Sequence, residues 1–374
     1  ERRARERAEQ RWLKEERDKQ KRGSDTAVFQ RDEVSSLGVG ADWKLMLAGR
    51  HQLTIGFDHY SDRVDSLRVD TDTVLGTTTI KDGSFAPGAE YMSSEIFIQD
   101  QLEGVGPWDF TLGARYSRYD FAFEEFGSGD LTEGDFSAFV ASAEAARDMG
   151  NNRRLVAVLS QGFRAPNLDD LAQDGDWAGG VEVHNPDLEP EDSLTAELAM
   201  EWSRPSWDAS LAVFSTQIDG YIGRLLTGEG DPATVGDEEY LRINSGELNL
   251  TGVEYSGRRY LGLSPFSLGF QAAYVKGRQE DPNEASLDGV PGRRVPPLFG
   301  RTSLRYEAED PSDKLEWAEF SLVFATDQDE LHPEDISDPR IDPDGTSGWA
   351  TLNLDLGGRL NEAFDWNLGL HNIL

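Results

Sequence analysis

The sequence predicts an all-β protein whose strands form an antiparallel transmembrane β-barrel, and its alternating apolar residues are the first reason. In the run HQLTIGFDHY, Leu53, Ile55 and Phe57 share one face of an extended chain. Similar runs recur along the chain, and no comparably long helical periodicity follows residue 22. They predict about 14 strands, centred near residues 41, 56, 98, 114, 142, 158, 198, 213, 253, 271, 303, 321, 353 and 368.

The links between these strands are the second reason, because they alternate in length. Short links fall at 48–50, 103–107, 150–153, 203–206 and 360–363, and long ones at 62–92, 165–192, 223–239, 278–296 and 327–348. A transmembrane barrel keeps its periplasmic turns tight and lets its outer loops grow, whereas a soluble sandwich has no reason to keep this alternation. The strands, of roughly 10 to 15 residues, are also longer than the roughly 9 to 11 that a tilted spanning strand requires.

Large aromatic residues near the short links are the third reason. A membrane barrel carries girdles of aromatic rings at both interfaces, where one side of the ring is apolar and the other wet. Three pairs of rings flank short links in this way, namely Trp108 with Phe110, Trp202 with Trp207, and Phe364 with Trp366. Aromatic residues also end strands in other β proteins, so the rings support the membrane interpretation only together with the alternating loops.

Composition excludes several classes of protein. The chain has 70 acidic and 36 basic residues and a net charge of -34, which repels nucleic acid. It has no cysteine, so disulfide frameworks, thiolate zinc sites and cysteine nucleophiles are excluded. No window reaches the roughly 18 apolar residues of a spanning helix, and the first 22 residues lack the apolar core of a signal peptide.

Two regions are expected. Residues 1–32 are expected to form a charged outer loop or an incoming strand, and residues 33–374 a partial barrel. The last residues stop where an outgoing strand would meet its loop and a closing strand. We therefore expect a barrel that is truncated at both ends, without its last strand.

Two proline-containing boxes connect the chain to a known family. The run SQGFRAPNLDDLA is followed by HNPDLEPEDSLTAELAMEW, and together they resemble the consecutive boxes in the barrel of TonB-dependent outer-membrane receptors. Further stretches agree in the expected order, namely HQLTIGFDHYSDRVDS, TGVEYSG, DGVPGRRVPPLFGRTSLRY and WATLNLDLGGRLNEAFDWNLGLHNIL. The resemblance extends from about Ser35 to Leu374.

This resemblance implies a 22-stranded barrel in the outer membrane, filled by an N-terminal plug that contacts the TonB complex and is missing from this chain. It implies a transporter that binds no permanent cofactor and takes up a small iron ligand, a ferric siderophore or haem. Passive porins, receptors for cobalamin or a glycan, and soluble all-β binding proteins remain as alternatives. An enzyme is not expected, because inward carboxylates such as Glu197, Glu201 and Asp355 suit a water-lined wall and no GxSxG or phosphate loop is present.

We interpret the boxes as the places at the barrel rim where one strand ends and the next begins. Their residues are Gly162, Phe163, Arg164, Ala165 and Pro166, followed by Asn185, Pro186, Leu188, Pro190 and Glu191. Pro166 cannot donate to a strand ladder and disfavours helix at Ala165, so a strand is expected to end there. By parity, Phe163 is expected on the lipid side and Arg164 on the inner side. Alternatively, the loop between the boxes contacts ligand.

Candidate ligand-binding residues are His184, Arg164, Asn167, Asn185 and His332. In haem receptors of the resembled family a histidine between the boxes binds haem iron, which implies His184 as the metal ligand if haem is the cargo. His332 lies in an acidic loop and is expected to be exposed, as a second imidazole for haem. The same loop, DQDELHPEDISDPRIDPDG, suggests calcium by its carboxylates but lacks the spacing of an EF-hand.

Overall fold

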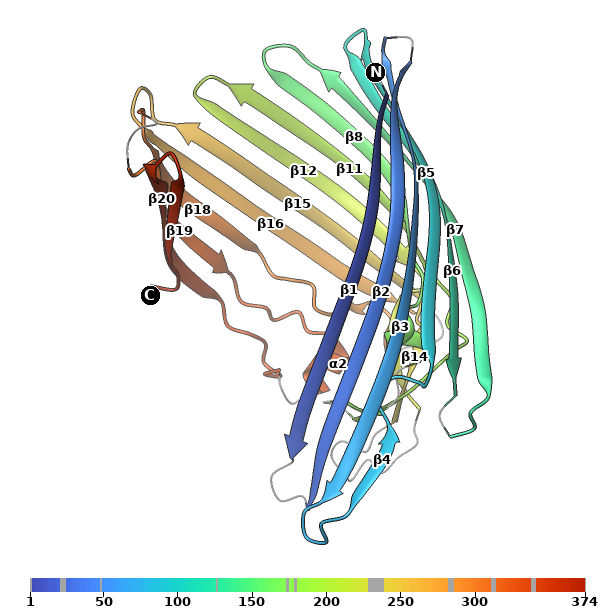
Figure 1. The fold of residues 1–374 in the computed structure, drawn as a ribbon. Helices are drawn as coiled ribbons and strands as arrows, with labels where there is room; N and C mark the ends of the chain where they lie inside the picture. Colours follow the sequence, from blue (N-terminus) through green and yellow to red (C-terminus); the bar gives the residue numbers. More distant parts are fainter. Residues whose placement is uncertain are drawn as a thin grey trace.

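A curved wall of long antiparallel strands dominates the computed structural model (Figure 1). The structure describes residues 2–20, 25–47, 49–125, 127–172, 175–177, 180–227, 239–281, 286–310, 314–337 and 341–373. No helix within these ranges is long and apolar enough to cross a membrane.

Each long strand pairs with the next along the chain. Their bounds are β1 Arg2–Gln20, β2 Thr26–Leu47, β3 His51–Asp72, β5 Ala89–Val105, β6 Trp108–Glu124, β7 Leu131–Asp148, β8 Arg153–Arg164, β11 Glu191–Arg204, β12 Trp207–Asp219, β15 Glu247–Tyr260, β16 Phe266–Glu280, β18 Phe299–Glu307, β19 Trp317–Ala325, β20 Trp349–Asn361 and β21 Phe364–Leu370. With the short strands β4 (Thr78–Asp82) and β17 (Val290–Pro291) they make one 17-stranded sheet. Every predicted strand centre lies within one of these strands.

The N-terminal region settles one alternative. Residues 2–20 form β1, which pairs with β2 from Arg2↔Leu45 to Gln20↔Ala27, so of the two alternatives for this region these residues follow the incoming strand; residues 1 and 21–24 lie outside the described ranges. The charged composition of this segment hides the period of two that marks the other strands. Backbone hydrogen bonds to the edge of β2 make it a strand nonetheless.

The two faces of the wall differ as the alternation predicts. Leu198, Val213, Val253 and Tyr274 are cross-strand partners in one row, and all four are exposed on the outer face. The described helices and the smaller sheet lie elsewhere, at the long-loop end of the wall (Figure 1). Among the described residues, no other layer of protein covers the apolar side of the wall, which is the arrangement of a membrane barrel.

The short links are tight turns at the other end of the wall (Figure 1). In the link between β7 and β8, Gly150, Asn151 and Asn152 have φ of 70°, 52° and 57°, values in the left-handed region that glycine and asparagine tolerate best. This local chemistry lets the chain reverse within a few residues. The long links are therefore gathered at the opposite end.

The long links fold back into the mouth of the wall as a small subdomain, which we call the cap. It consists of α1 (Leu168–Leu171) and a four-stranded sheet of β9 (Gly175–Trp177), β10 (Gly180–Val183), β13 (Ile222–Leu226) and β14 (Glu239–Asn244). A second short helix, α2 (Pro333–Ser337), lies in the link after β19. Buried side chains join the cap to the wall, namely Leu168, Leu171 and Leu188 with Val64, Phe121 and Phe123.

Candidate ligand-binding site

The two boxes form one ion-paired unit at the junction of wall and cap. Arg164 and Glu191 are direct cross-strand partners on β8 and β11. The guanidinium donates from Nε and Nη2 to the two Glu191 oxygens at 2.8 and 2.6 Å, and from Nη1 to Asp170 Oδ2 at 2.7 Å. A bidentate arginine–carboxylate pair fixes both partners in one plane. The first box therefore holds the second in register.

The first box also shapes α1. The Asn167 side chain accepts a hydrogen bond from the Asp170 amide at 3.0 Å, and the Asp170 side chain accepts one from the Asn167 amide at 3.1 Å. These two bonds form a capping box at the N-terminus of α1. Pro166 is fully buried, and its carbonyl accepts from the Tyr91 hydroxyl at 2.9 Å. The strand end predicted at Pro166 is present, and the Asn167 side chain is engaged in hydrogen bonds that hold α1.

The second box ties the cap to the wall. Asn185 donates from its side chain to the Arg242 carbonyl at 2.7 Å and accepts from the Asp187 amide at 3.0 Å. Leu188 is buried against the core of the cap, and Glu191 Oε1 accepts from the Ile222 amide at 2.8 Å. These contacts make each polar position of the box a structural partner of β13 or β14.

Phe163 requires a correction. Its ring is half-buried and lies 5.9 Å from the ring of Tyr119, which in turn contacts Tyr91 beneath the cap. The pairing of β7 with β8 ends at Ser142↔Ser160, whereas β11 stays paired with β8 as far as Glu191↔Arg164, so the end of β8 stays in the sheet but loses its β7 neighbour. The contact with Tyr119 departs from the free lipid-facing position predicted from parity, because parity assumes a paired neighbour on both sides of the strand.

A buried ionic cluster lies under the boxes. Arg242 contacts Glu182 and Asp170, and its Nη2 lies 2.9 Å from Asp169 Oδ2. Arg224 reaches the same Glu182 at 2.7 Å. Burial lowers the pKa of Arg242, but the neighbouring carboxylates outweigh burial and raise it above its usual value. The guanidinium is thus held charged, as buried arginines are when each donor has a partner.

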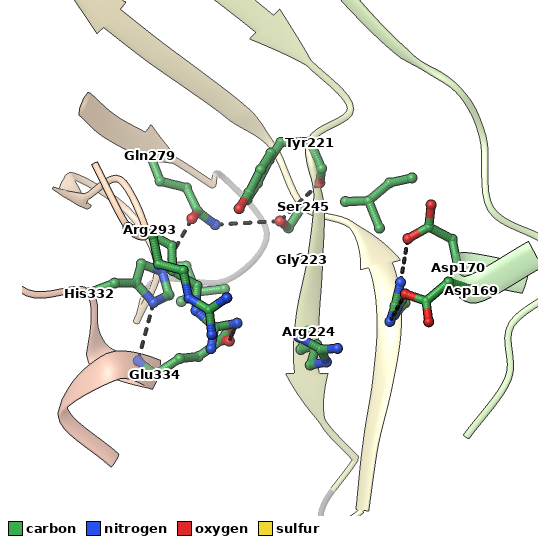
Figure 2. A pocket seen from close by; sticks show the side chains of 14 residues that line it. Asp169, Asp170, Tyr221, Gly223, Arg224, Ser245, Gln279, Arg293, His332 and Glu334 are labelled. Carbon is green, nitrogen blue, oxygen red and sulfur yellow. Dashed lines mark hydrogen bonds and ion pairs between the residues drawn. The ribbon is translucent and has the colours of Figure 1, made fainter. Parts of the chain in front are cut away.

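A polar cavity of about 300 Å³ opens beside this cluster (Figure 2). Side chains from the cap, the end of β16 and the link that carries α2 surround it. Its lining comprises Asp169, Asp170, Tyr221, Ile222, Gly223, Arg224, Arg242, Ser245, Gln279, Leu287, Arg293, Arg294, His332 and Glu334. The cavity lies at the long-loop end, where a ligand from outside would arrive first.

His332 lines this cavity. The sequence predicted that His332 would be exposed, and this prediction is wrong. Only 2% of its surface is accessible, because α2 folds over it. Its Nδ1 accepts from the Glu334 amide at 3.1 Å, so Nε2 carries the proton and faces Gln279 Oε1 at 3.2 Å. Burial lowers the pKa of His332 below its ordinary value, so the ring is neutral at pH 7.

The other predicted site residues lie near the cavity but do not line it. Arg164 and Asn167 reach it only through Asp170, and Asn185 touches the backbone of Arg242. His184 is half-buried on the wall side of the cap, where its ring meets Phe123 edge-on at 6.4 Å. The structure therefore does not bring His184 and His332 to one site.

The calcium site suggested by the acidic loop is not seen among the described residues. No group of three or more histidine or carboxylate side chains within the described ranges is arranged to hold a metal ion. Residues 338–340 of the acidic loop lie outside those ranges. Elsewhere in this loop, Glu334 and Asp335 are ion-paired to Arg293.

Comparison with known proteins places the fold. A family model described as TonB dependent receptor-like, beta-barrel matches residues 6–373. The chain belongs to the TonB-dependent receptor family. Three solved structures are similar to this receptor barrel: the copper transporter OprC (TM-score 0.74, 15% identity, 93% of this chain and 52% of that one), the ferric yersiniabactin uptake receptor FyuA from Yersinia pestis (0.69, 12%, 97% and 52%) and the ferric citrate transporter FecA (0.68, 13%, 99% and 54%).

Two curated proteins of Haemophilus influenzae match parts of the receptor barrel. Hemoglobin-binding protein A is 26% identical over 200 residues, which is 50% of this chain and 18% of that protein. Hemoglobin and hemoglobin-haptoglobin-binding protein A is 29% identical over 152 residues, 38% of this chain and 14% of that protein. The chain thus spans less than a fifth of these relatives and about half of the solved receptors.

Sequence reasoning missed most of the cavity of this receptor barrel. Tyr221, Arg242 and Arg293 were not among the candidates, although Arg293 lies in the stretch DGVPGRRVPPLFGRTSLRY that resembles the family. One signal was available in EYLRIN, where Arg242 interrupts a short apolar run and so predicts a buried charge in need of a partner. Its partner Glu182 lies 60 residues away in sequence, so pattern alone could not supply it.

Proposed function

We propose that the protein carrying this chain is an outer-membrane receptor that takes up an iron-bearing ligand, driven by the TonB complex through a plug. One observation carries the proposal: a receptor-family barrel wall ends in a folded cap with a polar cavity at its long-loop mouth. Such a site suits capture of a scarce ligand from outside, because convergent polar groups in a concave site fix a small molecule.

Iron is supported as the cargo by what the similar proteins bind. The curated relatives are named for haemoglobin, and similar structures include a ferric yersiniabactin uptake receptor, a ferric citrate transporter and a hemophore receptor in complex with its hemophore and heme. A copper transporter is also similar in fold, so another metal-bearing cargo is the second candidate. A passive porin is less favoured, because the cap packs a hydrophobic core into the mouth of the wall.

Growth of a deletion strain tests the proposal. A strain without the full-length gene is expected to grow poorly when iron is supplied only as the true ligand, and to recover when the gene is restored. Recovery is expected to require an intact TonB. Haemin, ferric citrate and a catecholate chelate are compared with free ferrous iron as the control. Equal uptake of every source with and without the gene or TonB would refute the receptor.

Haem is tested directly by titrating the purified full-length protein with haemin. If haem is the cargo, a Soret shift is expected, and His184→Ala is expected to weaken it because the imidazole is the proposed iron ligand. His51→Ala is the control, since His51 lies beside a short turn at the opposite end and pairs with Asp100 at 2.7 Å. An unchanged spectrum in wild type and both variants would remove haem and favour siderophores.

A further inference from the structure

Arg293 has a buried hydrogen-bond donor without a partner. Its Nε donates to Asp335 at 3.0 Å and its Nη1 to Glu334 at 2.5 Å, while Nη2 is buried with no partner among the described residues. The side chain is only 10% exposed and lines the polar cavity. Leaving a charged donor dry and unpaired is costly, so its presence at a cavity wall indicates a group that binds there.

Two further donors face the same space. The Tyr221 ring enters from the segment just before β13, and Figure 2 shows it and Arg293 among the side chains that line the cavity. Burial raises the pKa of Tyr221, so its hydroxyl stays protonated and can donate. Arg294, next to Arg293, also lines the cavity, is exposed, and has no ion pair with another described residue. Its charge is thus available to a bound group.

The carboxylates of the cavity are already neutralised. Asp169 and Asp170 are paired with Arg242, and Glu334 is paired with Arg293. A cation would have to compete with these guanidinium groups for the same oxygens. The groups left without protein partners are donors, so the chemistry that completes the cavity is an acceptor with negative charge.

We propose that this cavity binds an oxyanion, a carboxylate or phosphate group, between Arg293, Arg294 and Tyr221. The inference deepens and rests on the proposed function, since it identifies the carried ligand as one with an anionic oxygen group at its periphery. A volume of about 300 Å³ is at the small end of the range for ligand sites, which suits a small polyacid or one arm of a larger chelate.

Binding of two simple probes tests the site. The full-length protein in detergent is titrated with citrate and, separately, with inorganic phosphate by calorimetry. Arg293→Gln is expected to weaken the bound probe by about tenfold, because a charge-assisted bond is lost. Tyr221→Phe is expected to weaken it less, and Glu334→Gln to strengthen it, since that change removes a competing charge but keeps an amide acceptor.

Arg118→Gln is the matched control, because Arg118 is an exposed arginine paired with Asp120 outside the cavity. Binding of citrate alone assigns the site to carboxylates, and binding of phosphate alone assigns it to phosphates. Equal affinity in all variants, or no binding of either probe, overturns the inference. If Arg293→Gln unfolds the cap, Tyr221→Phe and Glu334→Gln decide by their opposite signs. Equal cellular uptake with and without the gene, together with intact citrate binding, would count against the proposed function but not against the cavity.

Discussion

Arg164 joins a strand end, a helix and the following strand through a single guanidinium group. Its partner Glu191 is mostly buried and also accepts the Ile222 amide, so one carboxylate holds β8 and the entrance to β13 together. Asp170 takes the third contact from the side of α1. Lysine could not replace this arrangement, because a point charge lacks the planar fork that serves two oxygens and a third acceptor.

Arg164→Gln is expected to loosen the cap. The variant loses charge-assisted bonds, a cost of about 1 to 3 kcal/mol because Arg164 itself is partly exposed and water compensates in part. Hydrogen exchange of the Ile222 amide, measured in the intact protein, is expected to speed up. Arg63→Gln, which removes an exposed pair with Glu90, is the control and is expected to leave exchange unchanged. Undisturbed protection of Ile222 in Arg164→Gln would contradict the clamp.

His332 makes the docking of α2 sensitive to acid. Burial lowers its pKa from the ordinary 6.5, Asp335 opposes this shift and Arg293 adds to it. A base with a lowered pKa in the folded state stabilises the fold fully above its unfolded pKa, and the stability is lost as pH falls from about 6.5 toward the folded value. Protonation would also cost the hydrogen bond that Nδ1 accepts from the Glu334 amide.

Exchange of the Glu334 amide is therefore expected to accelerate between pH 7.5 and 5, after correction for intrinsic rates. His332→Gln is expected to flatten this dependence, because the amide does not titrate in that range. The pKa of Glu334 is raised by burial, which favours the folded state in acid and works in the opposite direction. A pH dependence that persists in His332→Gln would show that another group controls α2.

At the scale of the element, each strand of the wall has two environments. On β11, Leu198 is exposed on the outer face and Glu197 is its neighbour on the inner face. In the proposed membrane, hydrocarbon covers the first and water the second. The alternation predicts the environment less well where a strand loses one neighbour, as β8 loses β7 after Ser160 while it stays paired with β11.

Leu198→Lys and Glu197→Lys are expected to differ sharply. A lysine on the lipid face near mid-membrane costs about 2 to 4 kcal/mol, whereas the inner wall tolerates it. We expect Leu198→Lys to fold poorly into lipid vesicles and Glu197→Lys to fold nearly as wild type, measured as the fraction of folded protein in each preparation. If Glu197→Lys folded poorly and Leu198→Lys folded nearly as wild type, the assignment of the lipid-facing side of the wall would be wrong.

At the scale of the whole molecule, the wall is stabilised by hydrogen bonds between neighbours and the cap by its own core. Many long strands pair in register over most of their length, for example all residues of β12 with β11. Closed or extended antiparallel ladders of this kind resist detergent, because no water competes for their backbone groups within the hydrocarbon region. The net charge of -34 keeps the loops hydrated but does not determine the fold.

The folded full-length protein is therefore expected to migrate differently in a gel before and after boiling in SDS. Boiling breaks the ladders, and the unfolded chain binds more detergent and changes mobility. The protein is also expected to aggregate when detergent is removed, because the apolar row on the outer face becomes exposed to water. Identical mobility in both samples and full solubility without detergent would refute the membrane barrel.

Local patterns in the sequence were sufficient for the wall. A period of two in apolar residues, short links with glycine and asparagine, and the Pro166 stop each depend on neighbours in sequence, so the fold class and strand positions could be predicted. Residues 2–20 are the exception, because their charges mask the period and only pairing with β2 makes them a strand. The boxes also showed where strands end, but not which residues their polar side chains contact.

Only the tertiary structure decided the site. Arg242 meets Glu182 across 60 residues, His332 meets Gln279 across 53, and Arg293 meets Asp335 across 42. These pairs form because the long links fold into one region at the end of the wall, where buried charges need partners. The partners are far apart in the sequence, so no periodic pattern predicts them. By itself the sequence determined which segments are strands and which face of each is apolar. The cavity, the burial of His332 and the contact of Phe163 with Tyr119 depend on how those segments pack.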